Sequence, residues 1–220
     1  MASFNLGKGQ SFQIDKGFAL VHCGLGWDPA PSGPAIDLDL HLFGLTHRNG
    51  DANQVQLYDE GSHALCYAFV KSAQNPGGSL KKNADGTFET IDGSMWHEKD
   101  DRTGRGVASG TDEDHAGMRE ETKLVLSSLP IDIMEVAVWA TIHDAEKRKQ
   151  DFSIVKGAFI EVCDPDDDEL CRYQLASEFA GKTAVQVASF MRGPDGQWKF
   201  HAVGAGSNVG LGDVINAYLG

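Results

Sequence analysis

Ile36-Asp37-Leu38-Asp39-Leu40-His41-Leu42 alternates apolar and polar residues without a break. Side chains on a β-strand point to its two faces in turn, so the leucines share one face while Asp37, Asp39 and His41 share the other. An apolar face of this kind has to pack against another layer of the protein. The stretch therefore predicts a half-buried strand whose second face carries neighbouring negative charges.

The rest of the chain repeats this strand pattern in short runs separated by many of its 26 glycines. Runs rich in β-branched and aromatic residues, bounded by turn residues, indicate many strands joined by turns. Helical spacing occurs only in a short segment after Asp144 and at 210–219. We expect a single all-β domain over residues 1–220, a two-sheet β-sandwich with a long acidic, glycine-rich loop and a short C-terminal helix. The expected strands are 18–26, 36–45, 64–71, 122–127, 135–143, 157–163, 170–175, 184–192 and 198–203.

Composition excludes several classes of protein. With 41% hydrophobic and 23% charged residues and a mean hydropathy of -0.30, the chain is typical of soluble globular proteins. Its net charge of -13 disfavours nucleic acid and favours multivalent cations as partners. The sequence shows neither a leader peptide nor a transmembrane segment, so we expect a cytoplasmic protein. Cys163 and Cys171 could face each other across a hairpin, but two ordinary strand cysteines are the favoured interpretation.

Asp37 and Asp39 would lie about 7 Å apart on their strand face. Two carboxylates at that spacing repel each other, and a hard cation such as calcium, which takes six to eight oxygen ligands at roughly 2.3–2.6 Å, would relieve the repulsion. The solvated outer face of an edge strand explains these residues equally well. The strand alone therefore does not decide between the two.

Residues 72–121 break the strand pattern with turn chemistry and predict a long loop. Within it, 97–106 and 111–114 gather acidic residues beside glycines. Glycines allow a loop to curl until carboxylate and carbonyl oxygens converge, as in calcium sites, whereas a flexible polar loop is the alternative. Asp144 follows the apolar run 136–143 and should emerge at the edge of a sheet.

Several blocks occur in an order that resembles the TerD family of tellurium-resistance and stress proteins, and they extend over nearly the whole chain. The resemblance implies a calcium-binding β-sandwich that acts in bacterial resistance to tellurite and other stresses with no known catalytic step. Matching the family's aspartates block by block gives the ligand candidates Asp28, Asp37, Asp39, Asp100 and Asp144. The blocks are Gly24-Leu25-Gly26-Trp27-Asp28, Asp37-Leu38-Asp39, Asp92-Gly93-Ser94, Asp100-Asp101-Arg102-Thr103-Gly104 and Thr141-Ile142-His143-Asp144-Ala145.

The central loop departs from the family pattern. Lys99 replaces a glycine, Asp101 replaces an asparagine, and the acidic end of the motif is stretched over 110–121. Alignment backwards from Pro130 places Glu120 at the final acid. Alignment forwards offers Asp112, Glu113 and Asp114 instead. We expect one or two calcium ions, with Asp101, Asp112, Glu113 and Glu120 as further candidate ligands.

Three functions follow as hypotheses. The first is a calcium-binding stress-response protein that is not an enzyme and works with other stress and tellurium-resistance proteins, in one variant at the inner face of the membrane. The second is a calcium-dependent membrane-surface adaptor, which would need exposed apolar residues such as Met95 and Trp96 near the acidic rim. The third is a hydrolase that uses His97, Asp100 and Asp101 around a metal. The acidic run 164–169 lacks the glycine and final acid of an EF-hand and predicts a hairpin turn.

Overall fold

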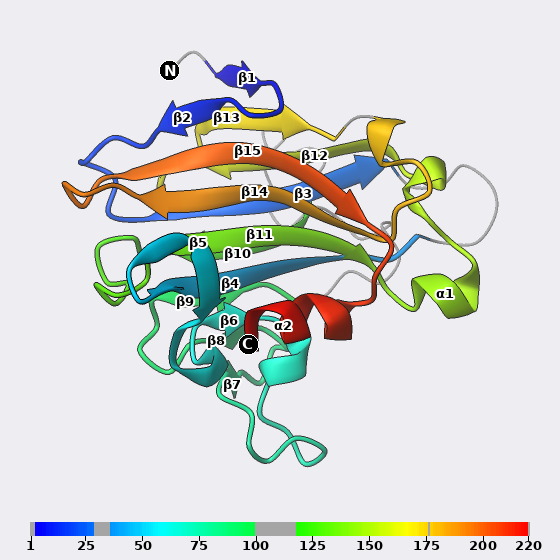
Figure 1. Ribbon diagram of the computed structural model, residues 1–220, viewed down its shortest axis with the longest axis horizontal. Coiled ribbons are helices and arrows are strands. Elements are labelled where there is room, and N and C mark those ends of the chain that lie inside the picture. The colour runs from blue at the N-terminus through cyan, green and yellow to red at the C-terminus, as the bar shows by residue number, and fades with distance from the viewer. Residues whose placement is uncertain (1–2, 29–35, 100–117, 176, 220) are drawn as a thin grey trace.

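The computed structural model describes residues 3–28, 36–99, 118–175 and 177–219, which form two β-sheets (Figure 1). The all-β, two-sheet fold predicted from the sequence is confirmed. The first sheet runs, in spatial order, β1 (Phe4–Leu6), β13 (Glu169–Gln174), β12 (Lys156–Cys163), β3 (Val21–Asp28), β10 (Met118–Leu124), β9 (Met95–His97), β8 (Phe88–Glu89) and β7 (Lys81–Lys82). The second runs β2 (Ser11–Gln13), β15 (Trp198–Ser207), β14 (Ala184–Arg192), β11 (Glu135–Ile142), β4 (Leu38–Arg48) and β5 (Asp51–Leu57), and β6 (Ala64–Leu65) also pairs with β4.

The main core lies between the sheets and follows the alternation of the strands. Leu38, Leu40 and Leu42 of β4 are buried in it, as the period of two predicts. Burial of a leucine side chain contributes about 1.5–3 kcal/mol, so these three residues fix which face of β4 points inward. The opposite face of β4 thereby carries Asp39 and His41.

Helix α2 (Leu211–Leu219) covers part of the outer face of the second sheet and confirms the predicted C-terminal helix (Figure 1). Its buried residues Val214 and Tyr218 share a second, smaller core with Phe43. The indole Nε1 of Trp139 donates a hydrogen bond of 3.0 Å to the Tyr218 hydroxyl. Strand β4 lies between β11 and β5, but β5 pairs with Leu45–Arg48 and β6 with Leu42 and Phe43, so the described strand pairing at Asp39 is with β11. The interpretation of a solvated edge is wrong for Asp37, which is 2% exposed.

The segment after Asp144 forms less helix than expected. Helix α1 (Ala145–Arg148) has four residues and is followed by Lys149, which adopts a left-handed conformation with φ 53°. The Asp151 side chain then accepts a hydrogen bond from the Ser153 N–H and starts the 3-10 turn η4 (Phe152–Ile154), after which β12 begins. A second such turn, η5 (Ser177–Phe179), follows β13.

Three sequence expectations about strands need correction. The expected strand 64–71 is the short β6 followed by a 3-10 turn, η2 (Tyr67–Phe69). The Asn75 side-chain amide donates hydrogen bonds to the carbonyl oxygens of Ala68 and Val70, in place of a neighbouring strand. The 3-10 turn η1 (Tyr58–Gly61) precedes β6. Strand β5 was not expected because its sequence is polar. Residues 72–121 are not all loop, since β7, β8, β9 and the start of β10 fall within them.

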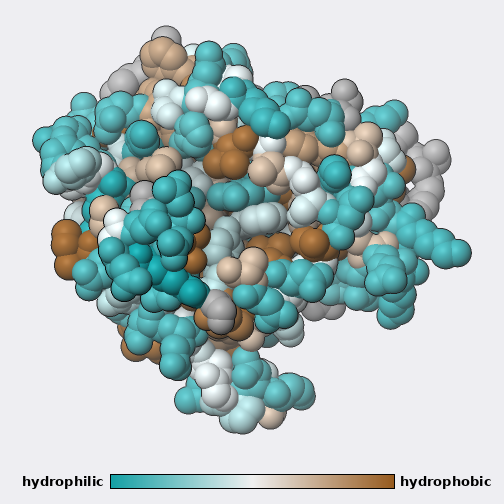
Figure 2. Space-filling model, in the orientation of Figure 1, coloured by the Kyte–Doolittle hydropathy of each residue, from teal (hydrophilic) through white to brown (hydrophobic). Residues whose placement is uncertain are grey.

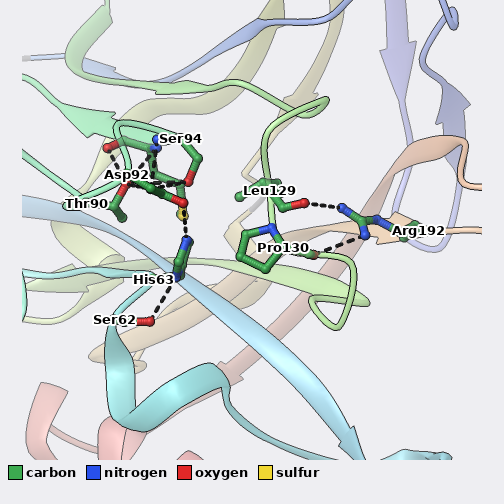
Figure 3. Close-up of polar contacts among 9 residues, drawn as sticks. Ser62, His63, Thr90, Asp92, Ser94, Leu129, Pro130 and Arg192 are labelled. Carbon is green, nitrogen blue, oxygen red and sulfur yellow. Dashed lines mark hydrogen bonds and ion pairs between the residues drawn. The ribbon is translucent and has the colours of Figure 1, made fainter.

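Two sets of polar contacts fix turns to the sandwich (Figure 3). His63 Nε2 lies 2.9 Å from Asp92 Oδ2, while Asp92 Oδ1 accepts hydrogen bonds from Thr90 and Ser94. His63 precedes β6 in the second sheet and Asp92 lies in the β8–β9 turn of the first, so this contact joins the two sheets. Arg192 at the end of β14 donates hydrogen bonds to the carbonyl oxygens of residues 129–131.

The cysteines and the acidic hairpin behave as predicted. All four cysteines are free and buried. Cys171 is paired with Val162 and Cys163 with Glu169, so the two cysteines are not cross-strand partners. The run 164–169 is a hairpin turn in which Asp164 Oδ1 accepts two backbone hydrogen bonds. Side chains of hydrophilic residues cover most of the face seen in Figure 2.

Candidate metal centre at one end of the sandwich

Strand ends bring aspartates to the end of the sandwich where α1 lies (Figure 1). Strand β3 finishes there with Asp28, and β4 begins there after Asp37. Leu38 pairs with Ile142, the last residue of β11, and the His143 N–H donates a 2.9 Å hydrogen bond to the Asp37 carbonyl oxygen. The antiparallel pairing of β4 and β11 therefore places Asp144 at the same end of the sandwich as Asp37 and Asp39.

Each of these three aspartates faces a basic side chain from residues 143–148. Arg148 Nη2 lies 3.2 Å from Asp37 Oδ2, and the Asp37 side chain is only 3% exposed. His143 Nδ1 lies 3.6 Å from Asp39 Oδ2. Lys147 Nζ lies 3.5 Å from Asp144 Oδ2, in a pair that is largely exposed. The three aspartates therefore lie at one end of the sandwich, each beside a basic side chain.

Glu120 is buried on β10, and its carboxylate accepts a hydrogen bond from the Leu40 N–H of the other sheet. His97 lies beside it, with Nε2 3.0 Å from the Leu40 carbonyl oxygen and Nδ1 2.8 Å from that of Glu98. Carbonyl oxygens only accept, so a protonated ring nitrogen of His97 donates to the carbonyl beside it, and Nε2 is 4.0 Å from Glu120. Glu120 and His97 together satisfy the backbone of β4 at Leu40 and connect the two sheets.

His41 does not act as a further base at this site. Burial, and then the nearby charge of His97, lowers the pKa of His41 to about 3, so the ring is neutral at pH 7. Its Nε2 lies 3.0 Å from Thr141 Oγ1. The polar face of β4 therefore combines carboxylates with a buried, neutral imidazole.

A cavity of about 420 Å³ opens among these groups. Asp37, Asp39 and Glu120 line it together with Arg148, and Phe88 and Tyr67 supply apolar wall. A second hollow of about 770 Å³ continues from Asp39 past Asp144 toward the start of α2. Carboxylate oxygens are the donors that calcium prefers, so the chemistry of this end fits a hard cation.

The described residues do not by themselves form a complete metal site. No three of their histidine, cysteine, aspartate or glutamate side chains are arranged to hold one ion. Four predicted ligands, Asp100, Asp101, Asp112 and Glu113, lie outside the described residues, as does Asp114. Asp28 is exposed at the end of β3, with its carboxylate close against the backbone of Gly157. The role of each candidate as a ligand therefore stays a prediction.

Sequence reasoning did not identify the basic partners. His143, Lys147 and Arg148 follow β11 within the run His143-Asp144-Ala145-Glu146-Lys147-Arg148. Acids and bases mixed in one short run directly after a strand are the signal for these partners, because a tight turn brings the bases back over the strand end.

The sandwich with its acidic end defines a class of protein, and comparison with known proteins identifies it. The TerD domain profile matches residues 1–218, so the chain belongs to the TerD family. Tellurium resistance protein TerD of Alcaligenes sp is 33% identical over 98% of this chain and 97% of its own length. General stress protein 16U of Bacillus subtilis is 32% identical with the same coverage. The crystal structure of a TerD homologue from Streptomyces coelicolor superposes with a TM-score of 0.57 at 24% identity, covering 92% of this chain and 96% of that one.

Proposed function

We propose that this protein binds calcium and serves in the stress response, including resistance to tellurite and other chemical stress, by binding partners rather than by catalysis. The observation that carries the proposal is the set of four aspartates, Asp28, Asp37, Asp39 and Asp144, at one end of the sandwich. The names of the relatives, a tellurium resistance protein and a general stress protein, support the biological part. Other stress and tellurium-resistance proteins in the cytoplasm are the partners we propose.

Calcium would be held by carboxylate oxygens of this end together with acids of 100–117. Six to eight oxygen ligands are more than the described aspartates supply, which is why we include the acids of that segment. Binding would draw carboxylates together that otherwise repel one another in a chain of net charge -13. A partner could then recognise the cation-bound end.

The two alternative functions have less support. For a membrane-surface adaptor, Met95 should be exposed, but it is fully buried, and Trp96 is half-buried with Lys123 Nζ 5.2 Å from its ring centroid. For a hydrolase, His97 should be available as a base, but both of its ring nitrogens contact carbonyl oxygens. None of the described helices is long and apolar enough to cross a bilayer.

A survival assay tests the biological part of the proposal. We would express the wild type and the double variant Asp37→Asn/Asp39→Asn in a tellurite-sensitive bacterial host and measure the lowest tellurite concentration that stops growth. We expect the wild type to raise this concentration and the folded double variant to lose the protection. Equal protection by both proteins would show that these carboxylates are not required, and no protection by either would contradict a role in tellurite resistance.

A further inference from the structure

Three carboxylates of the acidic end lie against bases of one short segment, residues 143–148. Arg148, His143 and Lys147 lie against Asp37, Asp39 and Asp144 respectively. Two of these bases, Arg148 and Lys147, carry a positive charge beside carboxylates that a bound cation would also have to approach. This arrangement is consistent with the absence, among the described side chains, of three groups that could hold one ion.

Burial ranks the three contacts. The pair of Lys147 with Asp144 is exposed on both sides, and such surface pairs contribute about 0–1 kcal/mol. His143 is also half-exposed. Asp37 is almost fully buried, and a buried carboxylate is costly unless a positive group or hydrogen bonds compensate it. Removal of Arg148 should therefore change the electrostatics of the site more than removal of His143 or Lys147.

Helix α1 can release Arg148 without disturbing the core. The helix has four residues, none of them buried, and left-handed residues Asp144 and Lys149 flank it. The Arg148 side chain is about one-third exposed, so its guanidinium can turn into solvent. Asp37, by contrast, is fixed by the hydrogen bond from the His143 N–H to its carbonyl oxygen.

We propose that Arg148 is a built-in counter-ion of the acidic end, which neutralises Asp37 when no divalent cation is bound and has to leave when calcium binds. Arg148 thus competes with calcium and sets the calcium concentration at which the site fills. This inference rests on the proposed function, because it concerns the same site. It assigns a regulatory role to a basic residue that is not a ligand.

The test compares calcium affinity, by calorimetry on the full-length chain, for the wild type, Arg148→Gln and Lys147→Gln. Arg148→Gln removes the charge against buried Asp37, and we expect its calcium Kd to fall at least tenfold. Lys147→Gln removes the same charge one residue away, beside exposed Asp144, and should change Kd less than about threefold. Lys199→Gln on distant β15 controls for net charge alone.

Thermal unfolding supplies a second readout. Without calcium, Arg148→Gln should melt below the wild type because the charge of Arg148 beside buried Asp37 is lost, and saturating calcium should remove most of this difference. Arg148→Lys, which keeps the charge, should stay folded and bind calcium with a Kd between those of the wild type and Arg148→Gln. It allows the test even if Arg148→Gln does not fold without calcium.

The outcomes separate this inference from the proposed function. If the wild type binds no calcium, the proposed function fails and this inference fails with it. If the wild type binds calcium but Arg148→Gln binds equally or more weakly, only the competition by Arg148 is overturned. The same conclusion follows if Lys147→Gln or Lys199→Gln increases the affinity as much as Arg148→Gln does, because the effect would then be one of overall charge.

Discussion

Gly157 shows how one small residue shapes the acidic end. Its φ is +62°, a conformation that side chains disfavour, and a Cβ atom there would lie 2.3 Å from Asp28 Oδ2. A residue other than glycine would have to push the Asp28 carboxylate away. Gly196 has a similar φ of +77° but open space around it, so it isolates the backbone effect.

We therefore expect Gly157→Ala and Gly196→Ala to lose a similar unfolding free energy, about 1 kcal/mol each, from backbone strain. The Asp28 carboxylate is the end of an exposed side chain and can turn away from the new methyl group at little cost. Only Gly157→Ala should also weaken calcium binding, since the displaced Asp28 is a candidate ligand. Denaturant unfolding and calorimetry measure the two effects. Equal calcium affinities in the two variants would show that the position of Asp28 does not matter for binding.

Asp92 gives a prediction about pH. Burial opposes its ionisation, but hydrogen bonds from Thr90, Ser94 and His63 outweigh burial and hold the pKa of Asp92 well below its usual range. A carboxyl with a depressed folded pKa stabilises the protein above its unfolded pKa, about 3.9, and this contribution is lost as the pH falls further. The side chain is 42% exposed, so solvent screening reduces the effect.

We expect Asp92→Asn to lower the unfolding free energy by about 1 kcal/mol at pH 6. The gap between wild type and variant should narrow as the pH falls from about 4 toward 2. Urea unfolding across this range gives the gap directly. Asp166→Asn, in the exposed hairpin turn, should differ from wild type by less than about 0.5 kcal/mol at every pH. A gap for Asp92→Asn that is constant down to pH 2 is inconsistent with this account.

At the residue scale, sequence reasoning placed the alternation of β4 and the grouping of Asp37, Asp39 and Asp144 correctly. The alternation follows from local periodicity, whereas the grouping with Asp144 also needs the antiparallel pairing of β4 with β11. The Arg148 contact with Asp37 depends instead on the left-handed turn at Asp144, and nothing in the local pattern of an aspartate announces that conformation. The sequence therefore shows that bases follow β11, but it does not show which aspartates they contact.

At the scale of elements, α2 shows how a short helix completes the sheet. Tyr218 is 8% exposed, contacts Phe43 and accepts a hydrogen bond from Trp139, whereas the next residue, Leu219, is 54% exposed. Replacing Tyr218 opens the outer face of β4 and β11. Replacing Leu219 removes only surface contacts.

Tyr218→Ala should lower the unfolding free energy by about 3 kcal/mol, since truncation of a buried aromatic residue leaves a cavity. Leu219→Ala should change it by less than about 0.5 kcal/mol. Denaturant unfolding compares the variants, and a red shift of the tryptophan fluorescence, from exposure of Trp139, should accompany Tyr218→Ala only. If both substitutions cost the same, α2 does not pack as described.

Long elements were predictable and short ones were not. β3, β4, β11, β12, β14 and β15 were all expected within a few residues, because each buries a periodic apolar face. β7 and β8 have two residues each, too few for any period to show, and they pair because neighbouring strands position them. The polar β5 gives no apolar signal either. Tertiary context, not local preference, determines these segments.

At the scale of the whole molecule, the fold gathers negative charge where a cation can bind. The chain carries 32 acidic and 19 basic residues, and strand order brings several of the acids to one end of the sandwich. A cation that binds only the folded state stabilises it by RT ln(1 + [L]/Kd), about 2.7 kcal/mol at a hundredfold excess over Kd. Magnesium requires tighter octahedral geometry and gives up water reluctantly, so calcium should be the better ligand.

Calorimetric titration of the full-length chain with calcium and with magnesium, beside the Asp37→Asn/Asp39→Asn variant, tests the central claim most directly. The account predicts saturable calcium binding to the wild type, at least tenfold weaker binding of magnesium, and loss of calcium binding in a double variant that remains folded by circular dichroism. Absence of calcium binding to the wild type, or an unchanged calcium Kd in the folded double variant, would contradict a calcium centre at this end of the sandwich.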